Sequence, residues 1–223
     1  MKTLIIIPAY NEGTRITKVL TKLKKQGYED VVVIDDGSKD NTSKVSKKAG
    51  VKVLRHVVNL GAGAATKTGL AYARINNYDY AVLIDADGQH APEEVSKLLK
   101  QAPKYDVVIG SRLIGTETKN MPLIRRFLNK GGSIVTKILF GLYVRDSQSG
   151  FKVLNKKAIN KIKLTFNGFE FCSEIIGEIK RNKLSFKEIP IKVIYTEESL
   201  AKGQTFFNGI KMIIKILSKK LVK

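Results

Sequence analysis

The chain has 223 residues, of which 43% are hydrophobic, and it carries 40 lysine and arginine residues against 20 aspartate and glutamate residues. This length and apolar content suit one folded domain with a large core and exclude disorder as the main state. The single cysteine, Cys172, excludes an internal disulfide, and the apolar run near the start is too short for a signal peptide. No uncharged stretch approaches the roughly 20 residues of a membrane-spanning helix. We therefore expect a protein of a reducing compartment that does not cross a membrane.

Short β-branched runs alternate with helix-like segments through the first half of the chain. Strands are expected at 4–7, 31–34, 51–54, 81–84 and 107–109, with helices such as 15–25 and 92–99 between them. This rhythm predicts an α/β fold, in which helices cover both faces of a mostly parallel sheet. Ligands bind such sheets beyond the carboxyl ends of the strands. The segments found there are PAYNE (8–12), DDGS (35–38), DADGQ (85–89) and GSR (110–112).

The DADGQ segment carries three oxygen-bearing side chains at a spacing of two residues, namely Asp85, Asp87 and Gln89. In an extended segment they would project from one face, which suits a hard cation such as Mg²⁺ or Mn²⁺. A plain Asp-Gly turn is the alternative. Asp35 and Asp36 also fit either a site or a turn followed by a helix cap. Two acidic doublets at two strand ends favour a site.

Taken in order, the motifs PAYNE, DDGS, LGAGAATKTGL (60–70), DADGQ, GSR and DSQSGF (146–151) resemble those of the family 2 glycosyltransferases of the GT-A fold. The similarity covers residues 2–195 and is greatest to the dolichol-phosphate mannose synthase group. It implies a Rossmann-like GT-A sheet and an inverting, metal-dependent enzyme. Such an enzyme would move a hexose from a nucleotide sugar, of the GDP-mannose or UDP-glucose type, to dolichyl or another polyprenyl phosphate.

The resemblance also implies roles for individual residues. Nucleotide-sugar contacts would be Pro8, Tyr10, Glu12, Ile34, Asp36, Asp85, Ala86, Asp87, Gln89 and Arg112. The implied metal ligands are Asp85, Asp87 and Gln89, and the implied catalytic residues are Asp87, Arg112 and Arg125. Arginine suits a place between donor and acceptor phosphates, because its planar fork binds phosphate oxygens bidentately. A solvated helix face is the alternative for Arg125.

The chemistry of the acceptor separates two kinds of enzyme. A phosphate monoester, with a second pKa near 6, is already an anionic nucleophile at neutral pH and needs no general base. The alternative is a hydroxyl acceptor, as in polysaccharide or glycoprotein synthesis, which would need a base such as Glu174 or Asp146. Nucleic-acid binding would explain the positive charge, but the acidic cluster would repel a phosphate backbone. We therefore expect no nucleic-acid partner.

The net charge of +20 is concentrated in the second half of the chain. Residues 1–112 carry 18 basic and 12 acidic groups, whereas residues 113–223 carry 22 and 8. Apolar residues also recur at helical spacing among the lysines of 206–223, and residues 121–144 repeat this pattern. A basic amphipathic helix of this kind favours contact with an acidic membrane surface, with ordinary packing against the domain as the alternative. We expect a peripheral protein at the cytoplasmic face of a membrane, held there by its own helices or by a membrane partner subunit.

These patterns divide the chain into a GT-A catalytic domain, 1–195, and a C-terminal segment, 196–223. The first contains a nucleotide-sugar half, 1–112, and an acceptor and membrane-facing half, 113–195. The second contains an acceptor loop and the basic amphipathic helix. The loop departs from the family pattern, because Thr196, Glu197 and Leu200 stand where arginine, glycine and lysine are expected. Lys152 likewise stands where the family often has arginine.

Gly61, Gly63 and Gly69 are interpreted as close-packing glycines at a helix start, because the stretch lacks the ending of a phosphate loop.

Overall fold

The structure, a computed structural model, describes residues 1–115 and 123–193. Its helices and strands are, in chain order, β1 (Thr3–Ala9), α1 (Ile16–Lys25), β2 (Val31–Asp35), α2 (Thr42–Lys48), β3 (Lys52–Arg55), α3 (Ala62–Ile75), β4 (Tyr80–Leu83), η1 (Pro92–Glu94), α4 (Val95–Leu99), β5 (Val107–Ser111), α5 (Leu123–Phe140), β6 (Lys152–Asn155), α6 (Lys156–Lys161), α7 (Phe171–Arg181) and β7 (Phe186–Pro190). The expected strands are all present within two residues at either end. The helix expected over 92–99 is divided into the 3₁₀ turn η1 and the short helix α4.

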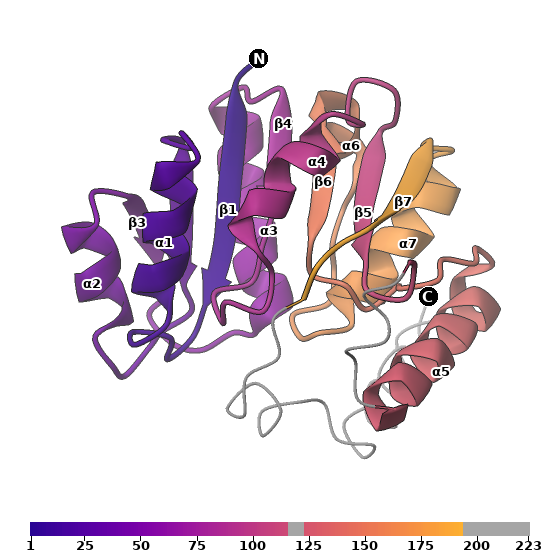
Figure 1. Cartoon of the computed structure of the whole chain (residues 1–223), viewed down its shortest axis with the longest axis horizontal. Helices are drawn as coiled ribbons and strands as arrows, with labels where there is room; N and C mark the ends of the chain where they lie inside the picture. The colour runs from indigo at the N-terminus through magenta and orange to yellow at the C-terminus, as the bar shows by residue number, and fades with distance from the viewer. Residues whose placement is uncertain (116–122, 194–223) are drawn as a thin grey trace.

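The seven strands form one sheet in the order β3-β2-β1-β4-β6-β5-β7 (Figure 1). All neighbouring pairs are parallel except those that involve β6, which runs antiparallel to both β4 and β5. The α/β fold with a mostly parallel sheet is therefore confirmed. The reversed strand within it was not predicted from the sequence.

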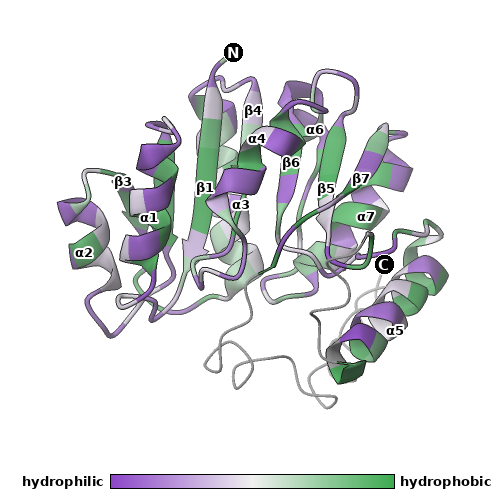
Figure 2. Cartoon of the chain, viewed as in Figure 1, coloured by the Kyte–Doolittle hydropathy of each residue, from purple (hydrophilic) through white to green (hydrophobic). Residues whose placement is uncertain are grey.

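Helices cover both faces of the sheet, and each strand contributes side chains to both. In β1, Leu4 and Ile6 join a core cluster with residues of α3, α6 and α7, whereas Ile5 and Ile7 join a second cluster with residues of α1 and α4. Successive side chains of a strand point to opposite faces, so a strand covered on both sides reads as a continuous apolar run. Figure 2 shows this continuous hydrophobic colour along β1.

The glycines of α3 allow close packing, as the sequence predicted. A Cβ at Gly69 would lie 2.3 Å from Cγ2 of Ile6, so α3 rests directly on β1. A Cβ at Gly63 would lie 2.4 Å from the carbonyl oxygen of Phe166, so the start of the same helix touches the backbone of the loop before α7. No real Cβ approaches other atoms so closely. These glycines therefore serve the packing of α3.

The reversal of β6 brings an additional segment to the functional edge of the sheet. The carboxyl ends of β1, β2, β4 and β5 lie at the lower edge in Figure 1. Because β6 is antiparallel to its neighbours, the segment 146–151 that precedes it lies at this same edge. Within the residues that the structure describes, no helix is both long and apolar enough to cross a bilayer.

Candidate active site

Segments far apart in the sequence meet at the carboxyl edge of the sheet. PAYNE lies at the end of β1, DDGS at the end of β2, DADGQ after β4 and GSR at the end of β5. The segment 146–151 joins them because it leads into β6. The prediction that polar and acidic groups converge on one edge is confirmed.

Asp87 and Gln89 are joined by two hydrogen bonds within the DADGQ turn. The Gln89 side-chain amide donates to Oδ2 of Asp87 at 2.6 Å, and the Gln89 backbone N–H donates to Oδ1 at 2.9 Å. Desolvation raises the pKa of Asp87, and repulsion from the Asp85 carboxylate raises it further. Desolvation also raises the pKa of Asp85, while the positive charges of Arg112 and Lys152 oppose the rise. Each carboxylate thus bears an electrostatic cost that a nearby cation would relieve.

The donor set fits a divalent cation that is bound together with a diphosphate. In the part of the chain that the structure describes, no three His, Cys, Asp or Glu side chains are grouped to hold a metal ion. Mg²⁺ is usually held by one or two carboxylates together with substrate phosphates rather than by a complete protein cage. Asp85 and Asp87 match such a partial set.

The Asp85 carboxylate rests against the backbone of Gly150. A Cβ at residue 150 would lie 2.5 and 2.6 Å from the two carboxylate oxygens, so glycine is needed for this approach. On the DADGQ side, Nδ1 of the buried His90 lies 3.3 Å from Oδ2 of Asp85. Burial lowers the pKa of His90 to about 4, against the opposing charge of Asp87, so its ring is neutral at pH 7. Among the residues that the structure describes, the cations near Asp85 are therefore Arg112 and Lys152.

Arg112 is fixed by a bidentate ion pair with Asp146. Nε and Nη2 of Arg112 donate to the two carboxylate oxygens at 2.8 and 2.7 Å, and the Arg112 backbone N–H donates to the same carboxylate at 2.8 Å. Asp146 is fully buried, which by itself would raise its pKa, but the charge and hydrogen bonds of Arg112 lower the pKa below its ordinary value. The loop before β6 thus sets the position of the arginine that ends the GSR motif.

Asp36 connects the end of β2 to the loop that follows β3 through hydrogen bonds. Its oxygens accept the backbone N–H groups of Leu60 at 3.0 Å and Gly61 at 2.7 Å, and one of them lies 2.6 Å from Nδ1 of His56. Nε2 of His56 lies 2.8 Å from the hydroxyl of Thr68 in α3. Both oxygens of this buried carboxylate are engaged, so any contact of Asp36 with a nucleotide would have to share or replace these bonds.

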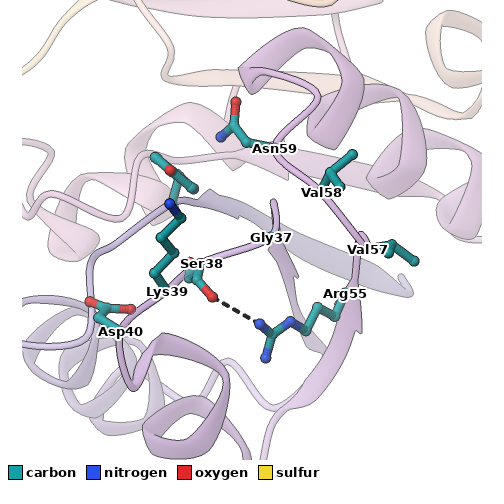
Figure 3. A pocket seen from close by; sticks show the side chains of 9 residues that line it. Gly37, Ser38, Lys39, Asp40, Arg55, Val57, Val58 and Asn59 are labelled. Atoms are coloured by element: carbon teal, nitrogen blue, oxygen red, sulfur yellow. Dashed lines mark hydrogen bonds between the residues drawn. The ribbon is translucent and has the colours of Figure 1, made fainter.

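A cavity of about 630 Å³ lies beside the DDGS turn (Figure 3). Its lining residues are Tyr10, Gly37, Ser38, Lys39, Asp40, Arg55, Val57, Val58 and Asn59. Nη2 of Arg55 donates to the carbonyl of Ser38 at 2.8 Å, the dashed bond in Figure 3. Tyr10 is the member of the predicted nucleotide contacts that lines this cavity.

The other predicted nucleotide contacts have mixed exposure. Pro8 lies near the end of β1 and is half-buried, whereas the side chains of Ile34 and Ala86 are buried. Ile34 and Ala86 can therefore reach a ligand only through their backbone atoms. The Glu12 carboxylate lies 2.6 Å from Nη2 of Arg15 at the start of α1.

Parts of the predicted site fall outside the described residues. Arg125 belongs to α5, but the placement of its side chain is outside the description. The acceptor loop at 196–203 and the helix expected at 206–223 also lie outside it.

The two carboxylates predicted as alternative general bases are both engaged in structural contacts. Asp146 is occupied by Arg112, as described above. The buried Glu174 accepts hydrogen bonds from the backbone N–H groups of Thr165 at 2.8 Å and Phe166 at 3.1 Å, and from the Thr165 hydroxyl at 2.5 Å. It closes the loop before α7 rather than facing an acceptor. The geometry therefore disfavours the hydroxyl-acceptor alternative that depended on them.

Comparison with known proteins identifies the family. The family described as Glycosyl transferase family 2 matches residues 4–163. The chain belongs to glycosyl transferase family 2. This confirms the predicted family, and the mostly parallel sheet with flanking helices is of the GT-A type.

Several members of the family are similar over nearly the whole chain. The UDP-N-acetylglucosamine–dolichyl-phosphate N-acetylglucosaminyltransferase of Methanococcus voltae is 39% identical, over 98% of this chain and 96% of that protein. The dolichol-phosphate mannosyltransferase of Pyrococcus furiosus is 31% identical, over 97% of this chain but only 64% of its own length. Among solved structures, glucosyl-3-phosphoglycerate synthase from Mycobacterium tuberculosis, in complex with Mn²⁺ and UDP-glucose, has a TM-score of 0.67 at 18% identity, covering 99% of this chain and 78% of that one. At this identity the structural likeness shows the fold alone.

Both histidines of the chain lie against acidic residues of this edge, and sequence reasoning missed both. His56 contacts Asp36, and His90 lies beside Asp85. Neither histidine belongs to a spaced motif, although His90 directly follows the DADGQ segment. That adjacency was the available signal for His90, whereas the contact of His56 depends on how β3 is placed beside β2.

Proposed function

We propose that this family 2 member is an inverting, metal-dependent glycosyltransferase that uses a nucleotide sugar to glycosylate a polyprenyl phosphate such as dolichyl phosphate. The observation that carries the proposal is the Arg112–Asp146 pair next to Asp85. It fixes a guanidinium beside a carboxylate site, where a donor diphosphate held at the carboxylates would meet an anionic acceptor. A positive charge that is already fixed where two anions approach each other reduces the repulsion between them, and so lowers the activation barrier of the transfer.

The proposed reaction is a single in-line displacement. An oxygen of the acceptor phosphate attacks the anomeric carbon of the sugar, and the bond from that carbon to the donor diphosphate breaks. The nucleoside diphosphate leaves with the bonding electron pair, and the configuration at the anomeric carbon is inverted. No proton has to be removed from a dianionic phosphate. This agrees with the structural engagement of Asp146 and Glu174.

Asp85 and Asp87 are the residues that we propose to hold a Mg²⁺ or Mn²⁺ ion, with Gln89 beside them. A bound cation would neutralise the donor diphosphate and stabilise it as a leaving group. Gln89 orients the Asp87 carboxylate through its two hydrogen bonds. Tyr10 and the cavity beside DDGS are proposed to receive the nucleoside part of the donor. Arg112, and Arg125 of α5, are proposed to bind the phosphates.

UDP-N-acetylglucosamine is the first donor to test, ahead of the GDP-mannose and UDP-glucose that the sequence suggested. The supporting observation is the relative named for that donor, which matches this chain over nearly the full length of both proteins. The matched mannosyltransferase is considerably longer than this chain. We further propose that the protein works at the cytoplasmic face of a membrane, since a lipid acceptor presents its phosphate at a membrane surface.

The test is a transfer assay with radiolabelled UDP-N-acetylglucosamine, UDP-glucose and GDP-mannose, each with Mg²⁺ or Mn²⁺ and a short polyprenyl phosphate. We expect label in the organic phase with one of these donors, and none when the matching polyprenol without its phosphate is the acceptor. Loss of transfer on chelation with EDTA should accompany this result. Transfer to the free alcohol, or full activity in EDTA, would overturn the proposed acceptor or the proposed metal, respectively.

A further inference from the structure

Helix α5 has its polar side inward. Ser133 and Thr136 are buried and face the segment 146–151 and α7. The Thr136 hydroxyl lies 3.1 Å from Oγ of Ser147 and 2.9 Å from Oγ of Ser173, and the Ser133 hydroxyl donates to the carbonyl of Arg145 at 2.9 Å. The inner side of α5 thus joins a seam of hydroxyl groups, and Phe140 at the end of the helix packs against Gly177 of α7.

Five large apolar residues of α5 are exposed on its outer side, whereas Leu128, Leu139 and Phe140 are half-buried. Leu123, Phe127 and Ile138 are 80%, 79% and 75% exposed, and Ile124 and Ile134 are also exposed. Within the described residues, neither apolar core cluster contains a side chain of α5. Figure 2 shows green and purple alternating along α5, which lies at the border of the molecule below β7. A surface helix of a water-soluble domain normally has the reverse arrangement.

The charges that accompany this apolar side are all positive. The α5 sequence contains Arg125, Arg126, Lys130 and Lys137 and no acidic residue. Of these, Arg126, Lys130 and Lys137 are exposed. An apolar stripe bordered by basic side chains matches a surface that offers hydrocarbon below a layer of negative charge.

We propose that the outer side of α5 docks on an acidic lipid leaflet, with Phe127 and Ile138 entering the headgroup layer and Arg126 and Lys130 contacting lipid phosphates. The inference rests on the proposed function, because it supplies the surface on which the lipid acceptor is met. It also links docking to the site. The hydroxyl seam joins α5 to the segment 146–151, whose Asp146 holds Arg112. Hydrogen bonds therefore connect the helix proposed to dock on the membrane with the loop that positions the arginine of the site.

The charges favour lipid over two other occupants of this face. Segment 206–223 of the same chain contains five lysines and no acidic residue, so it would repel the basic side chains of α5. A second copy of the chain would bring the same positive helix against itself. Like charges held close together oppose association, whereas an acidic leaflet attracts each lysine or arginine near its surface.

The test measures sedimentation of the full chain with vesicles, without any sugar donor. One set contains equal parts of phosphatidylglycerol and phosphatidylcholine, and the other contains phosphatidylcholine alone. The first variant, Phe127→Glu with Ile138→Glu, replaces two apolar contacts with negative charge; its control for an added carboxylate elsewhere is Ile75→Glu, at an exposed isoleucine at the end of α3. The second, Arg126→Glu with Lys130→Glu, reverses the charge; its control is Lys47→Glu with Lys48→Glu in the last turn of α2.

We expect the wild type to sediment with the acidic vesicles and not with the neutral ones. Both α5 variants should bind at least about tenfold more weakly, which is about 1.4 kcal/mol or more, while the two controls bind as the wild type does. Unchanged binding of the α5 variants would overturn the proposal. So would a wild-type dimer that the Phe127→Glu variant converts to a monomer, since a second copy would then cover α5. A fall in melting temperature as large as that of a core substitution would show that α5 is covered by the chain itself.

This experiment separates the inference from the proposed function. Transfer to a short, soluble polyprenyl phosphate needs no vesicle, so it should persist in both α5 variants. Vesicle binding without any transfer would leave the docking surface in place and overturn the proposed chemistry. Transfer without selective binding to acidic vesicles would support the proposed chemistry and overturn the docking surface.

Discussion

The contact between Gly150 and Asp85 gives the sharpest test of the proposed site. Gly150→Ala would place a methyl group 2.5 Å from the nearer carboxylate oxygen, whereas ordinary contact begins at 3.4 Å. The carboxylate must therefore move by about 1 Å, and a misplacement of that size at a reacting centre can cost about 100-fold in rate. We expect kcat/KM for transfer to fall by about 100-fold, equivalent to about 2.7 kcal/mol.

The same substitution should leave the fold nearly intact. Neighbouring groups crowd the Asp85 carboxylate and raise its pKa, but 45% of the side chain is exposed, so the carboxylate can swing towards solvent without displacing the core. We expect the free energy of unfolding to change by less than about 1 kcal/mol, below the usual cost of overpacking a core. The matched control is Gly131→Ala in α5, where a new Cβ meets nothing within 4 Å. That variant should keep full activity on a short acceptor and gain up to about 1 kcal/mol of stability.

The assay combines initial rates over a range of Mn²⁺ concentrations with thermal unfolding of each variant. A raised metal requirement in Gly150→Ala, with an almost unchanged melting temperature, would support the placement of Asp85 at the metal. Wild-type kcat/KM in this variant would refute it. A melting temperature that falls in step with activity would show that Gly150 serves folding and not the site.

Three further predictions concern charged and reactive groups. Asp146→Asn should lower kcat strongly and reduce stability by about 3–5 kcal/mol, because the partly buried Arg112 loses its charged partner. A double-mutant cycle with Arg112→Leu should show most of this loss as coupling, and additive effects would contradict the pairing. Burial alone would raise the pKa of Asp106, but hydrogen bonds, above all the one from Lys157, lower this pKa to about 2. The carboxylate should therefore contribute about 2 kcal/mol of stability above about pH 4, and this contribution is lost as the pH falls towards 2. Denaturant unfolding should show that Asp106→Asn loses less stability than the wild type between about pH 4 and pH 2. An equal loss of stability in the two proteins would argue against this role of Asp106. Cys172 is buried, and burial raises its thiol pKa to about 11, so a thiol reagent should modify it only after denaturant is added; rapid labelling of the native protein would contradict this.

The sequence was sufficient to predict the sheet because its strands are continuous apolar runs. The runs at 4–7 and 31–34 are covered on both faces and end in turn-forming residues, so their positions and their place in a mostly parallel sheet could be predicted from the pattern. The reversal of β6 was beyond that reasoning. Its four residues, Lys152–Asn155, are too short to show a direction, and their antiparallel pairing depends on contacts with β4 and β5.

The site was predictable where its residues follow strand ends, and not where it depends on contacts between loops. Asp85, Asp87 and Arg112 could be placed at one edge because each lies directly after or at the end of a strand. The pairing of Arg112 with Asp146 spans 34 residues, and the bond of Asp36 to His56 spans 20. No local pattern records such a partner. In the sequence alone, Asp146 therefore looks like an unpaired carboxylate that could serve as a base.

The position of β6 has a consequence for how the protein is made. β4 and β5 are synthesised first, but neither pairs with the other; the strand that joins them, β6, follows about 40 residues later in the chain. Until β6 leaves the ribosome, the nascent chain carries an unpaired edge on β4 with nothing beside it. Such an edge invites pairing with other chains. A fragment that ends at residue 112 should therefore aggregate rather than fold as a separate nucleotide-binding unit, and translation through β6 should be the stage at which the growing chain depends most on chaperones.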